Sequence, residues 1–322
     1  MRLLVAPDSF KGTFDARTVA EAVAGGVEEA GGAADRCVVA DGGEGTMEVL
    51  LEALGGERRT VEVHGPLRRP VAASFALLGD GETAVVEAAQ ASGLTLIAPS
   101  ERDAVRADTY GTGELIAAAI AAGARKVLVA VGGSATTDGG MGAIAALREG
   151  DALDAATRIE VLCDVTRPFE QAAALFAPQK GAGAKEVEYL GERLESFAAQ
   201  LPRDPRGVPM SGCAGGLSGG LWAHGARLRP GAAFVLEAIG FDDRLLAADA
   251  VVSGEGRLDS QSLEGKVVGE VGARCGRLGR PLHLVVGEDA LAIEPPAAIS
   301  SVSRARSLEE MRRAGFRLAS SR

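Results

Sequence analysis

Short apolar runs that end in glycine-rich, acid-bearing loops recur along this chain, and they constrain its fold more than any other feature. The runs at 36–40, 127–131 and 250–252 lead into the loops DGGEGT, GGSATTDGGMG and GEGRLDSQSLEGK. A stretch with the apolar spacing of a helix follows each loop. Strands that alternate with helices favour a parallel sheet with helices on its faces.

Both ends of the chain carry this alternation, but residues 59–89 do not. Residues 15–30 place apolar side chains at helical spacing, and strand and helix patterns resume near residue 240. Residues 59–89 instead alternate with a period of two between Gly-Pro and Gly-Asp-Gly turns, which predicts antiparallel strands. We expect an α/β protein with two domains: a doubly wound parallel-sheet domain formed by residues 1–58 plus 240–322, and an inserted α/β domain of residues 59–239.

The composition limits the partners of this protein. Of its 322 residues, 47% are hydrophobic and 24% are charged, which is ordinary for a globular protein. The net charge of −10 argues against nucleic acid or an anionic membrane as the main partner. The four cysteines form no C-x-x-C pair, and the opening MRLLVAPDSF reaches proline and aspartate too soon for a signal peptide. We expect a cytoplasmic protein with reduced thiols.

The three loops have a composition that suits ligand binding. A loop that leaves a parallel strand lies at the carboxyl edge of the sheet, where glycines let backbone N–H groups approach an anion. Acids in such loops hold Mg²⁺ or accept a proton from a hydroxyl group. Asp-Gly-Gly and Gly-Glu-Gly are also ordinary turn sequences, but three instances at predicted strand ends favour a phosphate or carboxylate site. Neither G-x-x-x-x-G-K-[ST] nor G-x-G-x-x-G occurs, and the three histidines are isolated.

Lysine is rare in this chain, and its positions support the same interpretation. Only five lysines occur, and Lys11, Lys180 and Lys266 each stand next to a glycine. A lysine in a glycine turn can supply positive charge to a phosphate.

Several motifs together resemble bacterial glycerate kinases of the two-domain type. The resemblance runs through most of the chain and rests on APDSFKGTFDARTVAEAVAGGV, ADGGEGTMEVLLEALGG, DTYGTGELIAAAI, VGGSATTDGGMGAIAAL, CDVTRPF, FAPQKGA, AGGLSGGL and SGEGRLDSQSLEGKV. It implies ATP-dependent phosphorylation of glycerate, usually to the 2-phosphate. It also implies a flavodoxin-like domain paired with a second α/β domain, with the active site in the cleft between them.

Placing that reaction on the loops gives each candidate residue a hypothetical role. Lys11 would meet the glycerate carboxylate or the transferred phosphoryl group. Asp41 is the first candidate for the general base, and Asp164 is the alternative. The candidate glycerate-binding residues are Asp8, Ser9, Glu44, Arg257 and Asp259, with Arg257 on the carboxylate. The candidate phosphate-binding residues are Gly132, Gly133, Ser134 and Lys180, and the candidate Mg²⁺ ligands are Asp138 and Glu255.

The chain also departs from this family, and the departures keep alternatives open. The segment around 150–158 is several dozen residues shorter than the family leads us to expect, and the stretch after 284–289 is abbreviated. One alternative is therefore a related kinase for another short hydroxy acid or polyol. Another is a metabolite-binding paralogue with little turnover. We expect ATP, Mg²⁺ and glycerate as ligands, no nucleic acid or membrane partner, and a monomer or homodimer.

Overall fold

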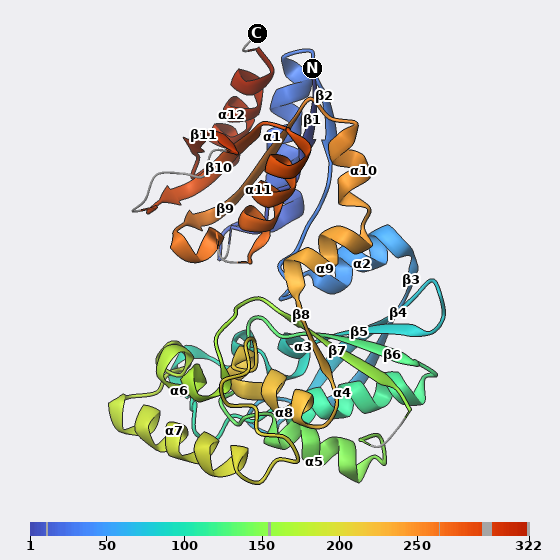
Figure 1. The fold of residues 1–322 in the computed structure, drawn as a ribbon, viewed down its shortest axis with the longest axis vertical. Helices are drawn as coiled ribbons and strands as arrows, with labels where there is room; N and C mark the ends of the chain where they lie inside the picture. Colours follow the sequence, from blue (N-terminus) through green and yellow to red (C-terminus); the bar gives the residue numbers. More distant parts are fainter. Residues whose placement is uncertain (11, 154–155, 264, 292–297, 321–322) are drawn as a thin grey trace. The chain divides into compact units, whose positions relative to one another are not determined.

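A computed structural model describes residues 1–10, 12–153, 156–263, 265–291 and 298–320. It is a mixed α/β protein with two sheets that contain parallel strands (Figure 1). Contacts divide the chain into two compact units, Met1–Asp41 with Ala232–Arg322 (unit 1) and Gly42–Gly231 (unit 2). The limits expected from the sequence lie at 58/59 and 239/240.

The sheet of unit 1 is entirely parallel. Its strands are β1 (Arg2–Val5), β2 (Ala33–Arg36), β9 (Ala250–Leu258), β10 (Leu282–Asp289) and β11 (Ile299–Arg304). They lie in the order β2-β1-β9-β10-β11, so that β1 pairs in parallel with β9 from the other end of the chain. Numbered as they appear along unit 1, this order is 2-1-3-4-5, one of the two common doubly wound orders.

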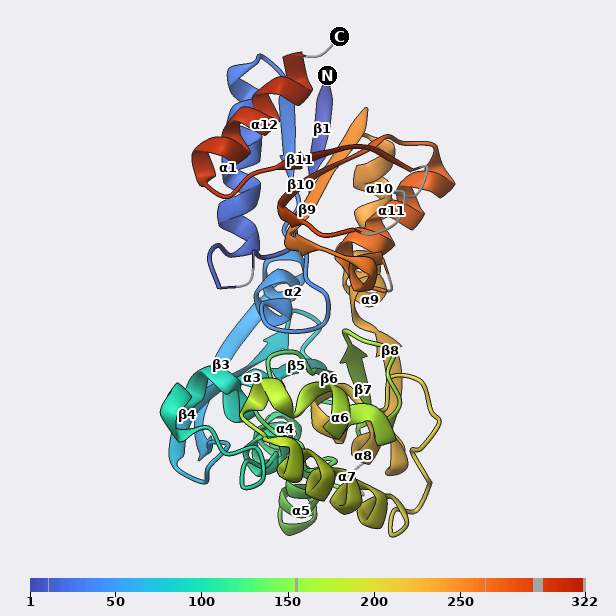
Figure 2. The same ribbon diagram turned by 90° about the vertical axis from the view of Figure 1, so that its left-hand side faces the viewer.

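Helices cover both faces of this sheet (Figure 2). They are α1 (Ala16–Glu29) and α12 (Leu308–Ser320) on one face, with α9 (Gly231–Ala238), α10 (Phe241–Leu246) and α11 (Val267–Leu278) on the other. The side chains of β1 alternate between the two faces of the sheet. Leu3 packs in the core under α1 and α12, and Leu4 packs in the core under α9, α10 and α11. Gly315 allows α1 and α12 to pack closely, since a Cβ there would lie 2.1 Å from the carbonyl oxygen of Val23.

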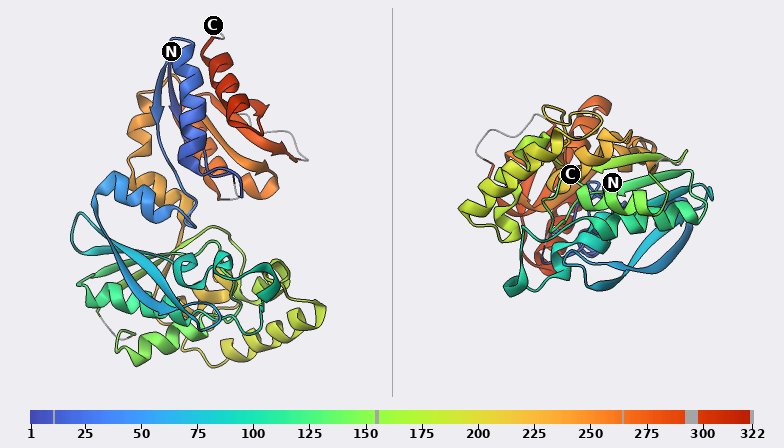
Figure 3. Two further views of the ribbon diagram at one scale, coloured as in Figure 1. Left: turned by 180° about the vertical axis from the view of Figure 1, so that it is seen from behind. Right: turned by 90° about the horizontal axis from the view of Figure 1, so that it is seen from below.

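The sheet of unit 2 joins an antiparallel part to a parallel part. Its strands, in spatial order, are β3 (Gly56–His64), β4 (Pro70–Leu78), β5 (Thr83–Glu87), β6 (Lys126–Ala130), β7 (Arg158–Cys163) and β8 (Arg227–Pro230). The first three pair antiparallel, which confirms the pattern predicted for 59–89, and β5 to β8 pair parallel. The helices of this unit are α2 (Thr46–Leu54), α3 (Ala88–Ser92), α4 (Tyr110–Ala121), α5 (Met141–Glu149), α6 (Ala172–Phe176), α7 (Ala184–Ala198) and α8 (Leu217–Ala223) (Figure 3).

The second strand is displaced from its predicted position. The apolar run 36–40 predicts a strand, but β2 is the half-polar segment Ala33–Arg36 and ends where that run begins. The Cys37 N–H still donates to the Val5 carbonyl at 2.8 Å, and Val39 is buried in the core of unit 1. Because β2 is an edge strand with few buried side chains, hydrophobicity marks the buried segment after it and not the strand itself.

Candidate active site

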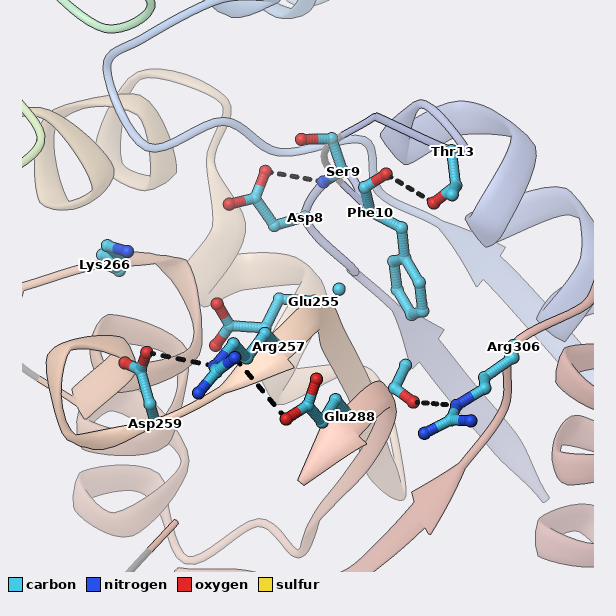
Figure 4. A pocket seen from close by; sticks show the side chains of 12 residues that line it. Asp8, Ser9, Phe10, Thr13, Glu255, Arg257, Asp259, Lys266, Glu288 and Arg306 are labelled. Atoms are coloured by element: carbon cyan, nitrogen blue, oxygen red, sulfur yellow. Dashed lines mark hydrogen bonds and ion pairs between the residues drawn. The ribbon is translucent and has the colours of Figure 1, made fainter. Parts of the chain in front are cut away.

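A pocket of about 550 Å³ lies at the carboxyl ends of the strands of unit 1 (Figure 4). It is lined by Asp8, Ser9, Phe10, Thr13, Glu255, Gly256, Arg257, Asp259, Lys266, Gly287, Glu288 and Arg306. The loop after β1 reaches it because the Asp8 N–H donates to the Gly254 carbonyl at 2.8 Å and so continues the strand pairing. The pocket therefore lies where the strand order reverses between β1 and β9, the position at which open α/β sheets bind ligands.

Charges of both signs face this pocket. Arg257 lies 3.5 Å from Glu288 and 3.9 Å from Asp259, and its side chain is 63% exposed. Arg306 donates to the Gly287 carbonyl at 3.2 Å. Asp259 accepts the Gln261 N–H at 2.9 Å. Since such exposed ion pairs are weak, Arg257 can exchange its present partners for an anionic ligand.

Two glycine loops of unit 2 lie directly against each other at the carboxyl end of β6. The Val131 N–H donates to the Gly42 carbonyl at 3.1 Å. A Cβ on Gly132 would lie 2.6 Å from the Cα of Gly43, and one on Gly133 would lie 2.1 Å from Oε1 of Glu44. Glycine suits position 133 because φ is +72°, which strains other residues, and because a side chain there would have to displace the Glu44 carboxylate.

Asp138 organises the end of the second of these loops. Its carboxylate is 4% exposed and accepts four hydrogen bonds. The donors are the Thr109 N–H (2.9 Å), the Thr109 hydroxyl (2.8 Å), the Gly140 N–H (3.1 Å) and the Gly142 N–H (3.0 Å). The glycine-rich segment before α8 packs on the same loop, where the Gly139 N–H donates to the Gly215 carbonyl at 3.0 Å. These bonds hold the loop in one conformation.

Lys180 lies beneath the same loop and is 3% exposed. Its ammonium group donates to the Ser134 hydroxyl at 3.2 Å and to the Thr136 carbonyl. Burial lowers the pKa of Lys180 to about 8, and the charges of Asp138 and Asp164 oppose that shift. Arg193 braces the neighbouring carbonyl of Thr137 at 2.8 Å.

The structure gathers the predicted site residues into two groups. Asp8, Ser9, Glu255, Arg257 and Asp259 line the pocket of unit 1. The other group, around the end of β6 in unit 2, contains Glu44, Gly132, Gly133, Ser134, Asp138 and Lys180.

Of the three predicted catalytic residues, the structure describes Asp41 and Asp164, and the charge of Asp164 acts on Lys180 of the second group. Lys11 lies outside the described residues. Asp41 is the last residue of the first segment of unit 1 and is buried. Asp164 directly follows β7 and is half-buried.

Sequence reasoning missed several residues. Two of them line the pocket: Glu288 lies near the carboxyl end of β10, and Arg306 follows the carboxyl end of β11. The argument that ligands bind at strand ends, applied to these two strands, could have found both residues. Glu87 ends β5 and accepts the Met47 N–H at 2.8 Å. No local signal marks Glu87, because its partner is 40 residues away.

The resemblance noted in the sequence implies Mg²⁺, and the surroundings of the candidate ligands Asp138 and Glu255 differ. Within the described ranges, no three or more histidine, cysteine, aspartate or glutamate side chains gather so that they could hold a metal ion. Mg²⁺ needs only one or two carboxylates when substrate phosphates supply other ligands. Glu255, in the wall of the pocket, has an oxygen donor set that fits. Asp138 does not fit, since its oxygens already accept four hydrogen bonds.

Known proteins resemble this chain over most of its length. The model of the "Glycerate kinase family" matches residues 3–156 and 147–318. A glycerate kinase of Halalkalibacterium halodurans is 35% identical over 97% of this chain and 94% of its own length. The glycerate 2-kinase of Escherichia coli K12 is 37% identical over 83% of this chain and 80% of its own length.

A crystal structure supports the same relationship. It comes from Salmonella typhimurium LT2, is described as a glycerate kinase 2, and is 34% identical. It superposes with a TM-score of 0.81 over 99% of this chain and 97% of its own. Among the helices that the structure describes, none combines the length and apolar character of a membrane span. The resemblance found in the sequence is confirmed: the chain belongs to the glycerate kinase family and is an enzyme, a phosphotransferase whose acceptor is an alcohol group.

Proposed function

We propose that this enzyme transfers the γ-phosphoryl group of ATP to the 2-hydroxyl of D-glycerate. Phosphorylation of glycerate is the general reaction of the family, and an Escherichia coli relative is named glycerate 2-kinase. The main support for the proposal is the lining of the pocket of unit 1. It contains three basic side chains, Arg257, Lys266 and Arg306, together with four acids. A small hydroxy acid, with one carboxylate and two hydroxyls, suits such a wall.

In this proposal the pocket of unit 1 binds glycerate. Arg257 forms a forked pair with the glycerate carboxylate, replacing its long contacts to Asp259 and Glu288. Asp8, Ser9 and Asp259 accept or donate hydrogen bonds at the hydroxyls. Lys11 adds positive charge from the same loop, although it lies outside the described residues.

The glycine loops of unit 2 bind the phosphates of ATP. Backbone N–H groups of Gly132 and Gly133 and the Ser134 hydroxyl are the donors. Ser134 can donate to a phosphate because its oxygen already accepts a bond from Lys180. Lys180 is thus a positive charge behind the loop, and Glu44, which covers Gly133, remains a candidate glycerate-binding residue.

The proton of the attacking hydroxyl needs an acceptor. Asp41 is our first candidate and Asp164 the second. Phosphoryl transfer depends mainly on positioning and on charge neutralisation, so the contribution of the base is modest. Mg²⁺, when bound, neutralises charge on the β- and γ-phosphates, and Glu255 is the candidate ligand. We assign Asp138 to holding the loop and not to the metal.

The test is ADP formation by the purified protein with D-glycerate, ATP and Mg²⁺, coupled to enolase without added mutase. Glycerate-dependent ADP formation with an enolase signal is the expected result, because enolase accepts the 2-phosphate. ADP formation without that signal would contradict the 2-position. A panel of short hydroxy acids and polyols at fixed ATP checks the specificity, and binding of glycerate without ADP formation would contradict the kinase proposal.

A further inference from the structure

Glu87 is a buried acid for which the proposed reaction has no role so far. It stands at the carboxyl end of β5, next to β6 in the sheet of unit 2, and is 5% exposed. Burial of a carboxyl group is costly unless hydrogen bonds compensate it. Its partners therefore indicate what it does.

The carboxyl group of Glu87 binds the start of α2. Its Oε1 accepts the Met47 N–H at 2.8 Å, and the Gly45 N–H and the Gln90 side chain also bind it. The first N–H groups of a helix lack partners within the helix, and a side chain at the N-cap usually supplies one. The N-cap residue of α2 is Gly45, which has no side chain. Glu87 supplies the cap from another element.

This cap fixes the segment that carries Glu44. The segment is attached at Gly42, whose carbonyl accepts the Val131 N–H at 3.1 Å, and at Met47, whose N–H binds Glu87. Between the two attachments Glu44 lies on Gly133, where a Cβ would be 2.1 Å from its Oε1. The position of Glu44 over the glycine loop thus depends on both ends of a six-residue stretch.

We propose that Glu87 is a positioning residue for phosphoryl transfer, which holds Glu44 over Gly133 by anchoring the first turn of α2. The inference rests on the proposed function, because it gives Glu44 and Gly133 their roles in the reaction. Without the Glu87 carboxyl group, two N–H groups lose their acceptor and the 42–47 segment is released at one end.

The charges of the two acids are also linked. Burial raises the pKa of Glu87, its hydrogen bonds oppose that shift, and the nearby Glu44 raises the pKa further. The two side chains therefore interact energetically, and a double-mutant cycle can measure that interaction.

The experiment measures kcat and KM for glycerate and ATP in E87Q, E87A, E44Q and the two double variants with E44Q. Glu82→Gln is the matched control, since Glu82 lies just before the other end of β5 and is exposed. We expect E87A to lower kcat/KM about 10- to 100-fold and E87Q to lower it less, because the amide oxygen can still accept the Met47 N–H. With Glu44 already replaced, removal of Glu87 should cost little more.

Additive losses, or an E87A enzyme equal to E82Q, would overturn the proposal. So would an E44Q enzyme with normal turnover, although glycerate-dependent activity of the wild type would then still support the proposed function.

A second measurement does not depend on activity. Hydrogen–deuterium exchange over residues 42–50 should be faster in E87A and E87Q than in the wild type and in E82Q. Unchanged exchange would overturn the anchoring role even in a protein without turnover. If E87A does not fold, E87Q carries both measurements.

Discussion

The pocket of unit 1 and the glycine loops of unit 2 hold their charges in different ways. In the pocket, Arg257 is 63% exposed and its ion pairs are 3.5 and 3.9 Å long. In the loops, Asp138 and Lys180 are almost fully buried, and Asp138 accepts four hydrogen bonds of 2.8–3.1 Å. The pocket can rearrange its side chains around a ligand, whereas the loops present a backbone that is already ordered.

The difference has an energetic basis. An exposed ion pair contributes about 0–1 kcal/mol, so that exchanging it for a ligand costs little. A buried polar group that loses its partner costs about 1–3 kcal/mol, so the loops resist rearrangement. Substitutions in the loops should therefore change stability as well as activity, and substitutions in the pocket should change mainly substrate affinity.

The largest expected effect comes from Asp138. Asp138→Ala leaves four buried donors without their acceptor, and we expect a loss of about 3 kcal/mol or more in the free energy of unfolding. Urea unfolding of the full chain measures it. Asp243→Asn, an exposed acid in α10, is the control and should change stability by less than about 0.5 kcal/mol. Equal stabilities of the two variants would contradict the conclusion that the hydrogen bonds of Asp138 hold the loop in one conformation.

Lys180 should make stability depend on pH. Its pKa is about 8 in the folded protein, below the 10.5 of an unperturbed lysine. Between these two pH values the unfolded chain binds more protons than the folded one, so this residue raises stability as pH increases from about 8 to 10.5. The gain is at most about 3 kcal/mol.

Comparison with Lys180→Met isolates this contribution. The difference in the free energy of unfolding between wild type and variant, measured by urea unfolding at pH 7 to 10.5, should move in favour of the wild type. A difference that stays constant over this range would show that Lys180 titrates as an exposed lysine does.

Gly133 and Gly81 form a matched pair for the contact with Glu44. Both have φ near +72°, but a Cβ on Gly81 would meet nothing within 4 Å. Alanine at either position costs about 1–2 kcal/mol of backbone strain. Gly133→Ala should in addition displace Glu44 and lower kcat/KM about 10- to 100-fold, as steady-state kinetics would measure. Equal activity of Gly133→Ala and Gly81→Ala would contradict a role for Glu44 in the reaction.

The smallest expected effect lies in the pocket. Arg257→Lys removes the forked geometry but keeps the charge, and we expect KM for glycerate to rise about tenfold with little change in KM for ATP. Arg125→Lys is the control, since Arg125 forms an exposed pair of 3.3 Å with Glu82. A rise in KM for ATP alone would contradict the proposal that Arg257 binds the glycerate carboxylate.

Much of the fold could be predicted from local pattern. The helix at 15–30 is observed as α1, and the antiparallel strands predicted in 59–89 are observed as β3, β4 and β5. The prediction of a strand at 36–40 was wrong, because β2 is an edge strand whose side chains are only partly buried. The glycine loop at Gly133 could be predicted because it follows an apolar run. The loop predicted from 254 onward begins later than expected, because β9 continues to Leu258 and Arg257 lies within the strand, paired with Glu288 of β10.

The sequence by itself determined which segments end in glycine loops, that both ends of the chain alternate strand and helix, and to which family the chain belongs. These properties lie in neighbouring residues and in ordered motifs. Only the tertiary structure decided that Glu87 caps a helix that starts 41 residues before it, and that Asp138 binds Thr109 across 29 residues. Burial and hydrogen bonding between distant segments select those partners, and local periodicity holds no information about them.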